Sequence, residues 1–311
     1  MTSWLPTATI DTLKERASLM KKTRDFFHQR GFLEVETPIL SHHTVTDPFL
    51  SSFKTHSLPP LFLQTSPEYH MKRLLSAGSG PIFQITKSFR QEEQGSRHNP
   101  EFTMLEWYRP GYNHHDLMDE MADFLHVMLE KSSTRISYKD LFQETLHLNP
   151  HTTSLETLKK CAVEHNIHLA NFDDADKDTY LDLLLSHCIE PNLGQTFPVF
   201  VYDYPASQAA LSVKRGNVGE RFEVYYRGIE LANGFHELID AKEQRQRFIE
   251  NLEKRRYLNF PDLSLDEHFL QSLEHGLPPS SGVALGFDRL VMLILNKKNI
   301  KEVMSFSIEN A

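Results

Sequence analysis

Arginines and glutamates gather between two strand-like runs in the stretch FQITKSFRQEEQGSRHNPEFTMLEWY, residues 83–108. Apolar residues alternate on both sides of a polar connection that contains Gly95, which is typical of an antiparallel hairpin. Arg90 closes the first run, and Glu106 lies inside the second. A solvated loop held by weak ion pairs would explain the charges in the connection. A binding or catalytic role is favoured instead, because two later stretches also combine charged residues with strand-like apolar runs.

The second such stretch is RFEVYYRGIELANGFHEL, residues 221–238. Alternation before Gly228 and a new apolar run after it predict two strands joined by a turn. Glu223, Glu230 and Glu237 follow one another at intervals of seven residues. Burying three carboxylates is costly unless they meet a cation, hydrogen-bond donors or a metal ion. Salt bridges to arginines of the same chain remain the alternative to a binding site.

The third stretch is SGVALGFDRLVMLIL, residues 281–295. This stretch begins with an apolar strand that contains Gly282 and Gly286. A hydrophobic helix follows, with Asp288 and Arg289 at its start. The N-terminus of a helix carries partial positive charge, so an arginine beside it creates a suitable binding site for a phosphate group.

The elements that must position these stretches can be predicted from periodicity and capping signals. Ser66 is predicted to cap a helix whose first residue is Pro67. Residues 152–187 show weaker helical periodicity around an acidic segment, residues 173–178, and are interpreted as a solvated insertion. The further expected elements are a helix over 12–30 capped by Thr12, an edge strand ending at Pro38, short strands over 61–64 and 197–204, and helices over 117–128, 240–257 and 265–275.

Composition narrows the class of protein. The 311 residues include 40% hydrophobic and 24% charged residues, as in an ordinary globular protein. A formal net charge of −9 argues against broad, nonspecific nucleic-acid binding. Cys161 and Cys188 form no CxxC pair, and the seventeen histidines form no HExxH motif, so neither a disulfide framework nor a zinc hydrolase is expected. No signal peptide or membrane span is apparent, and we expect a cytoplasmic protein.

The three stretches, in this order, resemble the signature motifs of class II aminoacyl-tRNA synthetases. Pro38 would end the dimer-forming first motif, FRQE with the downstream RHNPEFTMLEWY resembles the second, and GFDR ending in Arg289 resembles the third. ELANGFHEL is similar to lysyl-tRNA synthetases in particular. The resemblance implies an α+β fold, a mainly antiparallel sheet flanked by helices, in a single catalytic domain over residues 1–311 with a helical insertion at about 150–190. It also implies a homodimer.

One difference separates the chain from lysyl-tRNA synthetases, which carry an N-terminal OB-fold that grips the anticodon. Here the first motif begins close to Met1, so no OB-fold and no tRNA partner are expected. The chain resembles instead the truncated family of ligases that attach (R)-β-lysine to a lysine side chain of translation elongation factor P. Ala284 stands where the synthetases have a glycine, and its methyl group is expected to disfavour an α-amino group. The ANG of residues 232–234, where the synthetases usually have GNG, is expected to act similarly.

The resemblance also implies the roles of individual residues. Arg90 would hold the α-phosphate of ATP and Arg289 the γ-phosphate, and these two arginines would be catalytic. The other expected ATP-binding residues are Gln91, Glu92, Asn99, Phe102 (stacked on adenine), Glu230, Leu231 and Gly286. The expected residues around lysine or β-lysine are Ser66, Pro67, Glu68, Tyr108, Asn233, Phe235, Glu237 and Ala284. Glu223 and Glu230 would hold Mg²⁺, which prefers oxygen ligands.

Two other functions stay open at this point. A related lysine-activating enzyme could load a different acceptor, and a noncatalytic relative could only sense an amino acid. The presence of both Arg90 and Arg289 counts against a noncatalytic protein.

Overall fold

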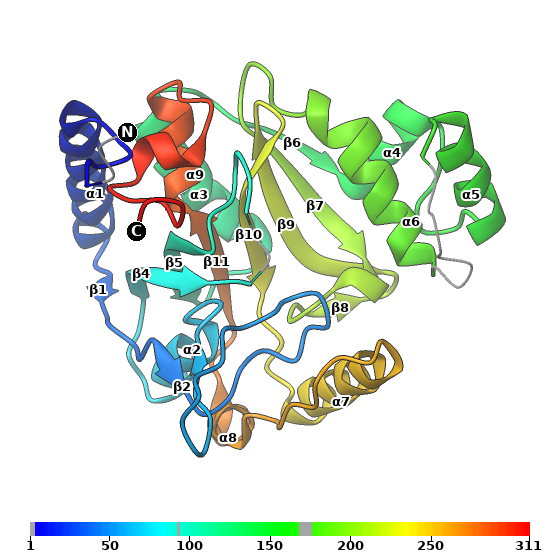
Figure 1. Ribbon diagram of the computed structural model, residues 1–311. Helices are drawn as coiled ribbons and strands as arrows, with labels where there is room; N and C mark the ends of the chain where they lie inside the picture. The colour runs from blue at the N-terminus through cyan, green and yellow to red at the C-terminus, as the bar shows by residue number, and fades with distance from the viewer. Residues whose placement is uncertain (1–3, 92–93, 168–175) are drawn as a thin grey trace. The chain divides into compact units, whose positions relative to one another are not determined.

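The computed structural model describes residues 4–91, 94–167 and 176–311 (Figure 1). The chain forms two compact units. Unit 1 comprises Met1–Tyr112 and Leu238–Ala311, and unit 2 comprises Asn113–Glu237. Among the described residues, every helix is too short or too polar to span a lipid bilayer.

Unit 1 is built on strands paired in the order β1-β4-β5-β11. The expected hairpin is confirmed, because β4 and β5 pair antiparallel from Ile82 opposite Tyr108 to Phe89 opposite Glu101. The elements are α1 (Ile10–Gln29), β1 (Leu33–Glu34), β2 (Leu40–Ser41), β3 (Phe62–Leu63), α2 (Glu68–Ser76), β4 (Ile82–Phe89), β5 (Glu101–Pro110), α7 (Ala241–Tyr257), α8 (Glu267–Gly276), β11 (Ser280–Gly286), α9 (Phe287–Ile294) and η4 (Ile300–Val303).

The two faces of this sheet differ in chemistry. On one face, Trp107 and Phe83 are fully buried against Phe27 of α1, with ring centroids 5.1 and 4.7 Å from that of Phe27. We call the opposite face the Glu106 face, because Glu106 lies there with its neighbours Gln84 on β4 and Ala284 on β11. The period of two along each strand thus separates an apolar core from a row of polar groups.

Two predicted helix starts in unit 1 are wrong by one or two residues. The first helix begins at Ile10, and its cap is Thr9, whose hydroxyl accepts a hydrogen bond from Thr12 N at 3.2 Å. The second begins at Glu68 rather than Pro67. Ser66 nevertheless satisfies a backbone donor of this helix, since Glu68 N donates to Ser66 Oγ at 3.1 Å.

The strands near the N-terminus are shorter than expected. The predicted edge strand is reduced to β1, which pairs in parallel with β4 at the edge of the sheet. The strand predicted over 61–64 is β3, and it joins β2 in a separate two-stranded sheet. The C-terminal elements follow the predictions closely: Asp240 caps α7, Asp266 caps α8, and Gly286 precedes α9.

Unit 2 is built on strands in the order β10-β9-β7-β6, with β8 paired to β9. Arg227 and Gly228 join β9 to β10, both with positive φ (52° and 68°), as a tight hairpin turn of the primed type requires. The elements are α3 (His114–Leu129), β6 (Thr134–Ser137), α4 (Tyr138–Leu146), α5 (Leu155–Glu164), α6 (Lys177–Leu184), η1 (Leu185–Ile189), η2 (Glu190–Asn192), β7 (Val199–Pro205), η3 (Ala206–Gln208), β8 (Lys214–Arg215), β9 (Val218–Tyr226) and β10 (Ile229–His236).

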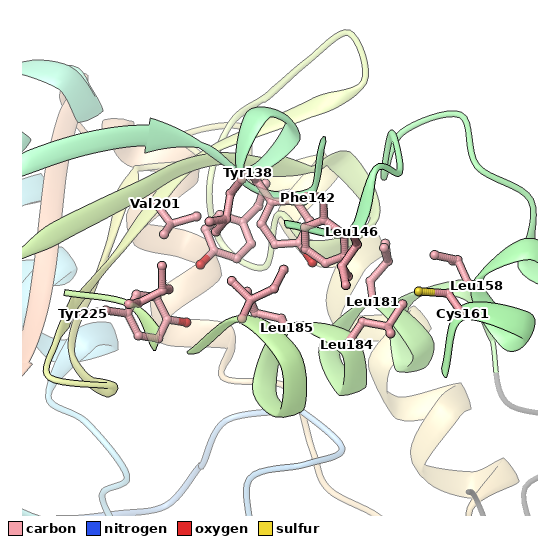
Figure 2. Packing of buried hydrophobic residues seen from close by; sticks show 14 of the residues in the cluster. Tyr138, Phe142, Leu146, Leu158, Cys161, Leu181, Leu184, Leu185, Val201 and Tyr225 are labelled. Carbon is pink, nitrogen blue, oxygen red and sulfur yellow. The ribbon is translucent and has the colours of Figure 1, made fainter. Parts of the chain in front are cut away.

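The helices α4, α5 and α6 of unit 2 lie together beyond β6 and β7 (Figure 1). They are not a purely solvated insertion, which corrects the expectation from the acidic segment. Their apolar side chains form one buried cluster with residues of β7 and β9 (Figure 2). Members of this cluster include Tyr138, Phe142, Leu181, Tyr204 and Tyr225, all at most 2% exposed. Half of the acidic segment, residues 173–175, lies outside the described residues.

Candidate active site

A buried carboxylate marks the Glu106 face of unit 1. Glu106 is 1% exposed, and the hydroxyl of Tyr108 donates a hydrogen bond to its Oε1 at 2.6 Å. The two residues are neighbours because side chains two positions apart share one face of a strand. Glu106 was noted in the sequence without an assigned role, whereas Tyr108 was expected to contact the substrate.

The helix α2 brings a second carboxylate and an ammonium group to this place. Glu68 Oε1 lies 2.5 Å from Nζ of Lys72, one helical turn further on, and Lys72 is 1% exposed. Burial and the negative charge of Glu68 raise the pKa of Glu106 to about 8. The hydroxyl of Tyr108, the charge of Lys72 and the hydroxyl of Ser66 partly offset that rise in pKa. Two carboxyl groups thus share one buried cation, which is an arrangement suited to receiving a further ammonium group.

The glycine-rich strand β11 lies along β5 and completes the Glu106 face. Its register places Gly282 opposite Tyr108, Ala284 opposite Glu106 and Gly286 opposite Met104. Ala284 and Gly286 are partly exposed, whereas Val283 and Leu285 between and beside them are buried. The methyl group of Ala284 therefore lies on the same face as the Glu106 carboxyl group. Pro67 is buried at the start of α2.

Arg90 and Phe102 meet at the loop end of the β4–β5 hairpin. The guanidinium carbon of Arg90 lies 5.2 Å from the centroid of the Phe102 ring. Arg90 N donates to Pro100 O at 2.9 Å, which keeps the two strands paired at this point. Gln91 is exposed beside Arg90, and Glu92 lies outside the described residues.

Asn99 ends the same connection and is 6% exposed. Its amide nitrogen donates to Glu101 O at 2.6 Å, and its amide oxygen accepts from Ile308 N at 3.0 Å. In the structure Asn99 therefore ties the hairpin loop to the C-terminal segment.

Arg289 approaches this hairpin loop from α9. Its Nη2 donates to Nε2 of His98 at 2.6 Å, and its Nε donates to Arg97 O at 3.4 Å. Asp288, the preceding residue, accepts from Thr103 N at 2.6 Å and pairs with Arg16 at 2.6 Å. Asp288 thereby fixes the start of α9 against β5, and the structure brings Arg289 and Arg90 to the same end of the hairpin.

In unit 2, Glu223 lies on β9 with hydrogen-bond donors on both carboxylate oxygens. Arg221 forms an ion pair with Oε1. The hydroxyls of Tyr204 and Tyr225 donate to Oε2 at 2.6 and 2.5 Å. The guanidinium carbon of Arg221 also lies 4.4 Å from the centroid of the Tyr204 ring. These contacts hold Glu223 in one orientation.

The expected residues of β10 share the face of Glu223. Asn233 lies opposite Glu223, and Phe235 opposite Arg221. We call this the Glu223 face. The amide oxygen of Asn233 is buried without a hydrogen-bond partner among the described residues, which leaves an acceptor for a ligand.

The remaining expected residues of β10 differ in exposure. Glu230 is half-buried opposite Tyr225, and Glu237, just beyond the strand, is 1% exposed. Leu231 is 2% exposed and sits where the register shifts between Glu230 and Ala232. Its side chain is therefore core, and only its backbone groups are available to a nucleotide.

Glu106 and Lys72 have no role predicted from the sequence. A carboxylate within an apolar strand, two residues from Tyr108, was a signal for Glu106. Lys72 follows Glu68 by four residues, which places both on one side of a helix, and this spacing could have indicated the pair.

Comparison with known proteins identifies the family. The family model described as tRNA synthetases class II (D, K and N) matches residues 5–310. A protein of Edwardsiella ictaluri named elongation factor P–(R)-β-lysine ligase is 50% identical over 322 residues, covering 100% of this chain and 99% of the relative. A Haemophilus influenzae protein of the same name is 50% identical over 319 residues, covering 99% and 98%. The chain therefore belongs to the class II tRNA synthetase family of the D, K and N type.

Proposed function

We propose that this protein is an ATP-dependent ligase that activates (R)-β-lysine and joins it to a lysine side chain of translation elongation factor P. Relatives that carry this name match the chain over its whole length at about 50% identity. The structural observation that carries the proposal is the placing of Lys72 between partly buried Glu68 of α2 and buried Glu106, which lies on the strand pair that also leads to Arg90. One buried and one partly buried carboxyl group close to a single cation suit a substrate with two ammonium groups.

The reaction has two steps. A carboxylate oxygen of β-lysine attacks the α-phosphorus of ATP, the bond to pyrophosphate breaks, and an acyl-adenylate forms. The ε-amine of the acceptor lysine then attacks the acyl carbon, loses a proton and displaces AMP, leaving an amide. The first step requires positioning and neutralisation of phosphate charge more than acid–base catalysis.

The arginines at the loop end of the hairpin supply that neutralisation. Arg90 binds the α-phosphate, where charge develops as the carboxylate attacks, and Arg289 binds the γ-phosphate. Phe102, under the Arg90 guanidinium, offers a flat apolar surface for adenine. Gly286 leaves room beside Arg289, since a methyl group there would lie 3.5 Å from the Arg289 side chain.

A Mg²⁺ ion fits the carboxylates of unit 2 by its preference for oxygen ligands. Glu223 accepts three hydrogen bonds in the structure, and a carboxylate has about four acceptor positions. One position of Glu223 and the carboxylate of Glu230, on the same face, would hold the ion. Bound there, Mg²⁺ would screen the charge of the triphosphate.

The charge of the pocket selects the amino acid. In unit 1, Ser66 and Glu68 are assigned to the amino end of the substrate, and Tyr108 to its other ammonium group. In unit 2, Glu237 is assigned to an ammonium group, and Asn233 and Phe235 to the rest of the substrate. Leaving a buried carboxylate without its ammonium partner costs about 3–5 kcal/mol. At about 1.4 kcal/mol per factor of ten, the pocket rejects neutral side chains by about a hundred- to a thousandfold.

Preference for β-lysine over α-lysine depends on a smaller group. The Ala284 methyl lies cross-strand from Glu106, where it narrows the substrate pocket relative to a glycine. One methyl group is worth about 1–3 kcal/mol in a pocket. Selection of the β-isomer is therefore expected to be weaker than rejection of neutral side chains.

We also infer a cytoplasmic homodimer that does not act on tRNA. The first motif supplies the dimer surface, and its residue Leu33, on the edge strand β1, is 54% exposed. Exposed apolar residues at a sheet edge favour association with a second copy.

Mass spectrometry of elongation factor P tests the proposal. Incubation with this protein, ATP and (R)-β-lysine should add one β-lysyl mass to the factor, and α-lysine should add its mass more slowly. Arg90→Ala should abolish the addition, while Arg256→Ala, which removes an exposed arginine of α7, should leave it unchanged. Full activity of Arg90→Ala would refute the role of Arg90. Lysine-dependent exchange of pyrophosphate into ATP without any labelled factor would instead favour a different acceptor.

A further inference from the structure

Two histidines and a glutamate come together in unit 2, away from the Glu223 face. One ligand atom each of His114, Glu220 and His236 lies within 4.8 Å of the others. His114 and Glu220 are buried, at 4% and 5% exposure, and His236 is half-buried. No role was expected for any of the three from the sequence motifs.

The strand register explains why these residues meet. Arg221 on β9 lies opposite Phe235 on β10, so the next pair is Glu220 and His236. Successive side chains of a strand point to opposite faces of the sheet. Glu220 and His236 therefore lie on the opposite face of the sheet from Glu223. The side chains of His236 and the next residue, Glu237, likewise point to opposite faces.

His114 reaches the same place from α3. It is the first residue of that helix, after the cap Asn113, and α3 packs on β9 and β10. The start of the helix is fixed by a reciprocal pair of hydrogen bonds between Asn113 and Asp116. The position of His114 over the sheet is therefore set by a capped helix end rather than by a loop.

The hydrogen bonds of His114 leave one ring nitrogen for a ligand. Its Nε2 lies 3.1 Å from Oδ1 of Asp203, and a carboxylate can only accept, so Nε2 carries the proton. Nδ1 of the neutral ring is then an acceptor. It is buried and has no hydrogen-bond partner among the described residues. A histidine held at one nitrogen by a carboxylate, with a lone pair at the other, is the common arrangement of a metal-binding histidine.

The other contacts of the cluster are compatible with a ligand role. Nδ1 of His236 is in hydrogen-bond contact with Oε2 of Glu220. Arg215 Nε lies 2.6 Å from Oε1 of Glu220, but the Arg215 side chain is 76% exposed. An exposed arginine contributes little to holding a buried carboxylate. The buried charge of Glu220 is therefore only partly compensated from within the chain.

We propose that His114, Glu220 and His236 form a binding site for one divalent transition-metal ion of the zinc class, with Asp203 orienting His114. Two imidazole nitrogens and a carboxylate suit zinc, whereas magnesium prefers oxygen ligands alone. Zinc requires distances of about 2.0–2.2 Å to such ligands. Ligand atoms already within 4.8 Å of one another can close on an ion by small side-chain movements.

The ion links α3 to the back of the strands that carry Glu223 and Glu230. Its role is to stabilise unit 2, because none of its three ligands lies on the Glu223 face. A ligand that binds only the folded state raises the melting temperature in proportion to the logarithm of its concentration above the dissociation constant. The proposal does not depend on the proposed ligase activity.

Zinc binding by the full chain tests the site. Protein stripped with a chelator and then dialysed should take up one equivalent of Zn²⁺, measured by elemental analysis and by competition with a chromophoric chelator. The melting temperature should rise with Zn²⁺. X-ray absorption at the zinc edge should show nitrogen and oxygen neighbours, and sulfur neighbours would place the ion elsewhere and overturn the proposal.

Variants locate the ion. His114→Ala and Glu220→Gln should each weaken Zn²⁺ binding by about a hundredfold or more, since loss of even an outer-shell partner costs about 10–100-fold. His126→Ala, which removes an exposed histidine from the other end of α3, is the matched control and should bind as the wild type does. Circular dichroism of the metal-free variants establishes that they fold. Absence of stoichiometric uptake by the wild type, or undiminished uptake by both variants, would overturn the proposal.

Discussion

Replacing Glu106 with glutamine removes a carboxyl group whose pKa is raised to about 8. At pH 7, one unit below that value, about nine in ten Glu106 carboxyl groups carry a proton. An ammonium group bound against Glu106 favours its ionised form, so binding of β-lysine at pH 7 should release about 0.9 proton. Glu106→Gln has no proton to release and should bind about ten- to a hundredfold more weakly, because a hydrogen bond to a charged group contributes about 1.5–3 kcal/mol.

Isothermal titration calorimetry of β-lysine binding in buffers of different ionisation enthalpy measures the released proton directly. The wild-type affinity should rise as the pH approaches about 8, and that of Glu106→Gln should be insensitive to pH in this range. Equal heats in all buffers for the wild type, or an equal proton release by the variant, would refute the role of Glu106.

The free energy of unfolding should also depend on the protonation state of Glu106. Because the folded pKa of Glu106 is above its ordinary value of 4.5, its contribution to stability is complete below pH 4.5 and is lost as the pH rises through about 8. Urea unfolding should show this decline in the wild type, and Glu106→Gln should remove it. A stability difference between the two proteins that is the same at pH 5 and pH 9 would contradict the raised pKa.

Three further substitutions test the packing of the site. Lys72→Met leaves partly buried Glu68 without the ammonium group 2.5 Å away, and should lower the free energy of unfolding by about 3 kcal/mol in urea titrations at pH 7. A loss below about 1 kcal/mol would refute the pairing. Gly234→Ala places a methyl group 2.4 Å from the ring of Phe222, and should lower the melting temperature, with partial recovery when Phe222→Leu is added. Asp288→Asn removes the charge from an ion pair of 2.6 Å, and should destabilise unit 1 and slow pyrophosphate exchange; an unchanged unfolding midpoint would show that the pair is unimportant.

Much of the scaffold could be predicted because its patterns are local. The alternation of apolar residues gave the β4–β5 hairpin, and the glycines at 282 and 286 with the following apolar run gave β11 and α9. Helix starts were less certain, since Thr9 and Thr12 are both good caps and only the fold selects Thr9. The family resemblance supplied the site residues, and the structure brings together those that share a unit.

Features that depend on distant partners could not be predicted. Lys72 lies one helical turn after Glu68, so their closeness follows from local spacing. The burial of Lys72 depends instead on the packing of α2 on β5, which the local sequence does not reveal. The acidic segment over residues 173–178 indicated a solvated insertion, whereas the apolar residues on either side of it lie in α5, α6 and η1. Only the pairing of those helices with β7 and β9 reveals that their apolar sides form a shared core.

The buried cluster limits which helices of unit 2 can be deleted. Tyr204 and Tyr225, whose hydroxyls hold Glu223, belong to the same buried cluster as the apolar side chains of α4, α6 and η1. Figure 2 shows Tyr225 in this cluster. Excision of these helices would leave both rings in water and free the carboxylate to rotate. The helices thus support the orientation of Glu223. In the proposed ligase, where Glu223 would hold Mg²⁺, deletions that spare every motif residue should still slow ATP-dependent turnover.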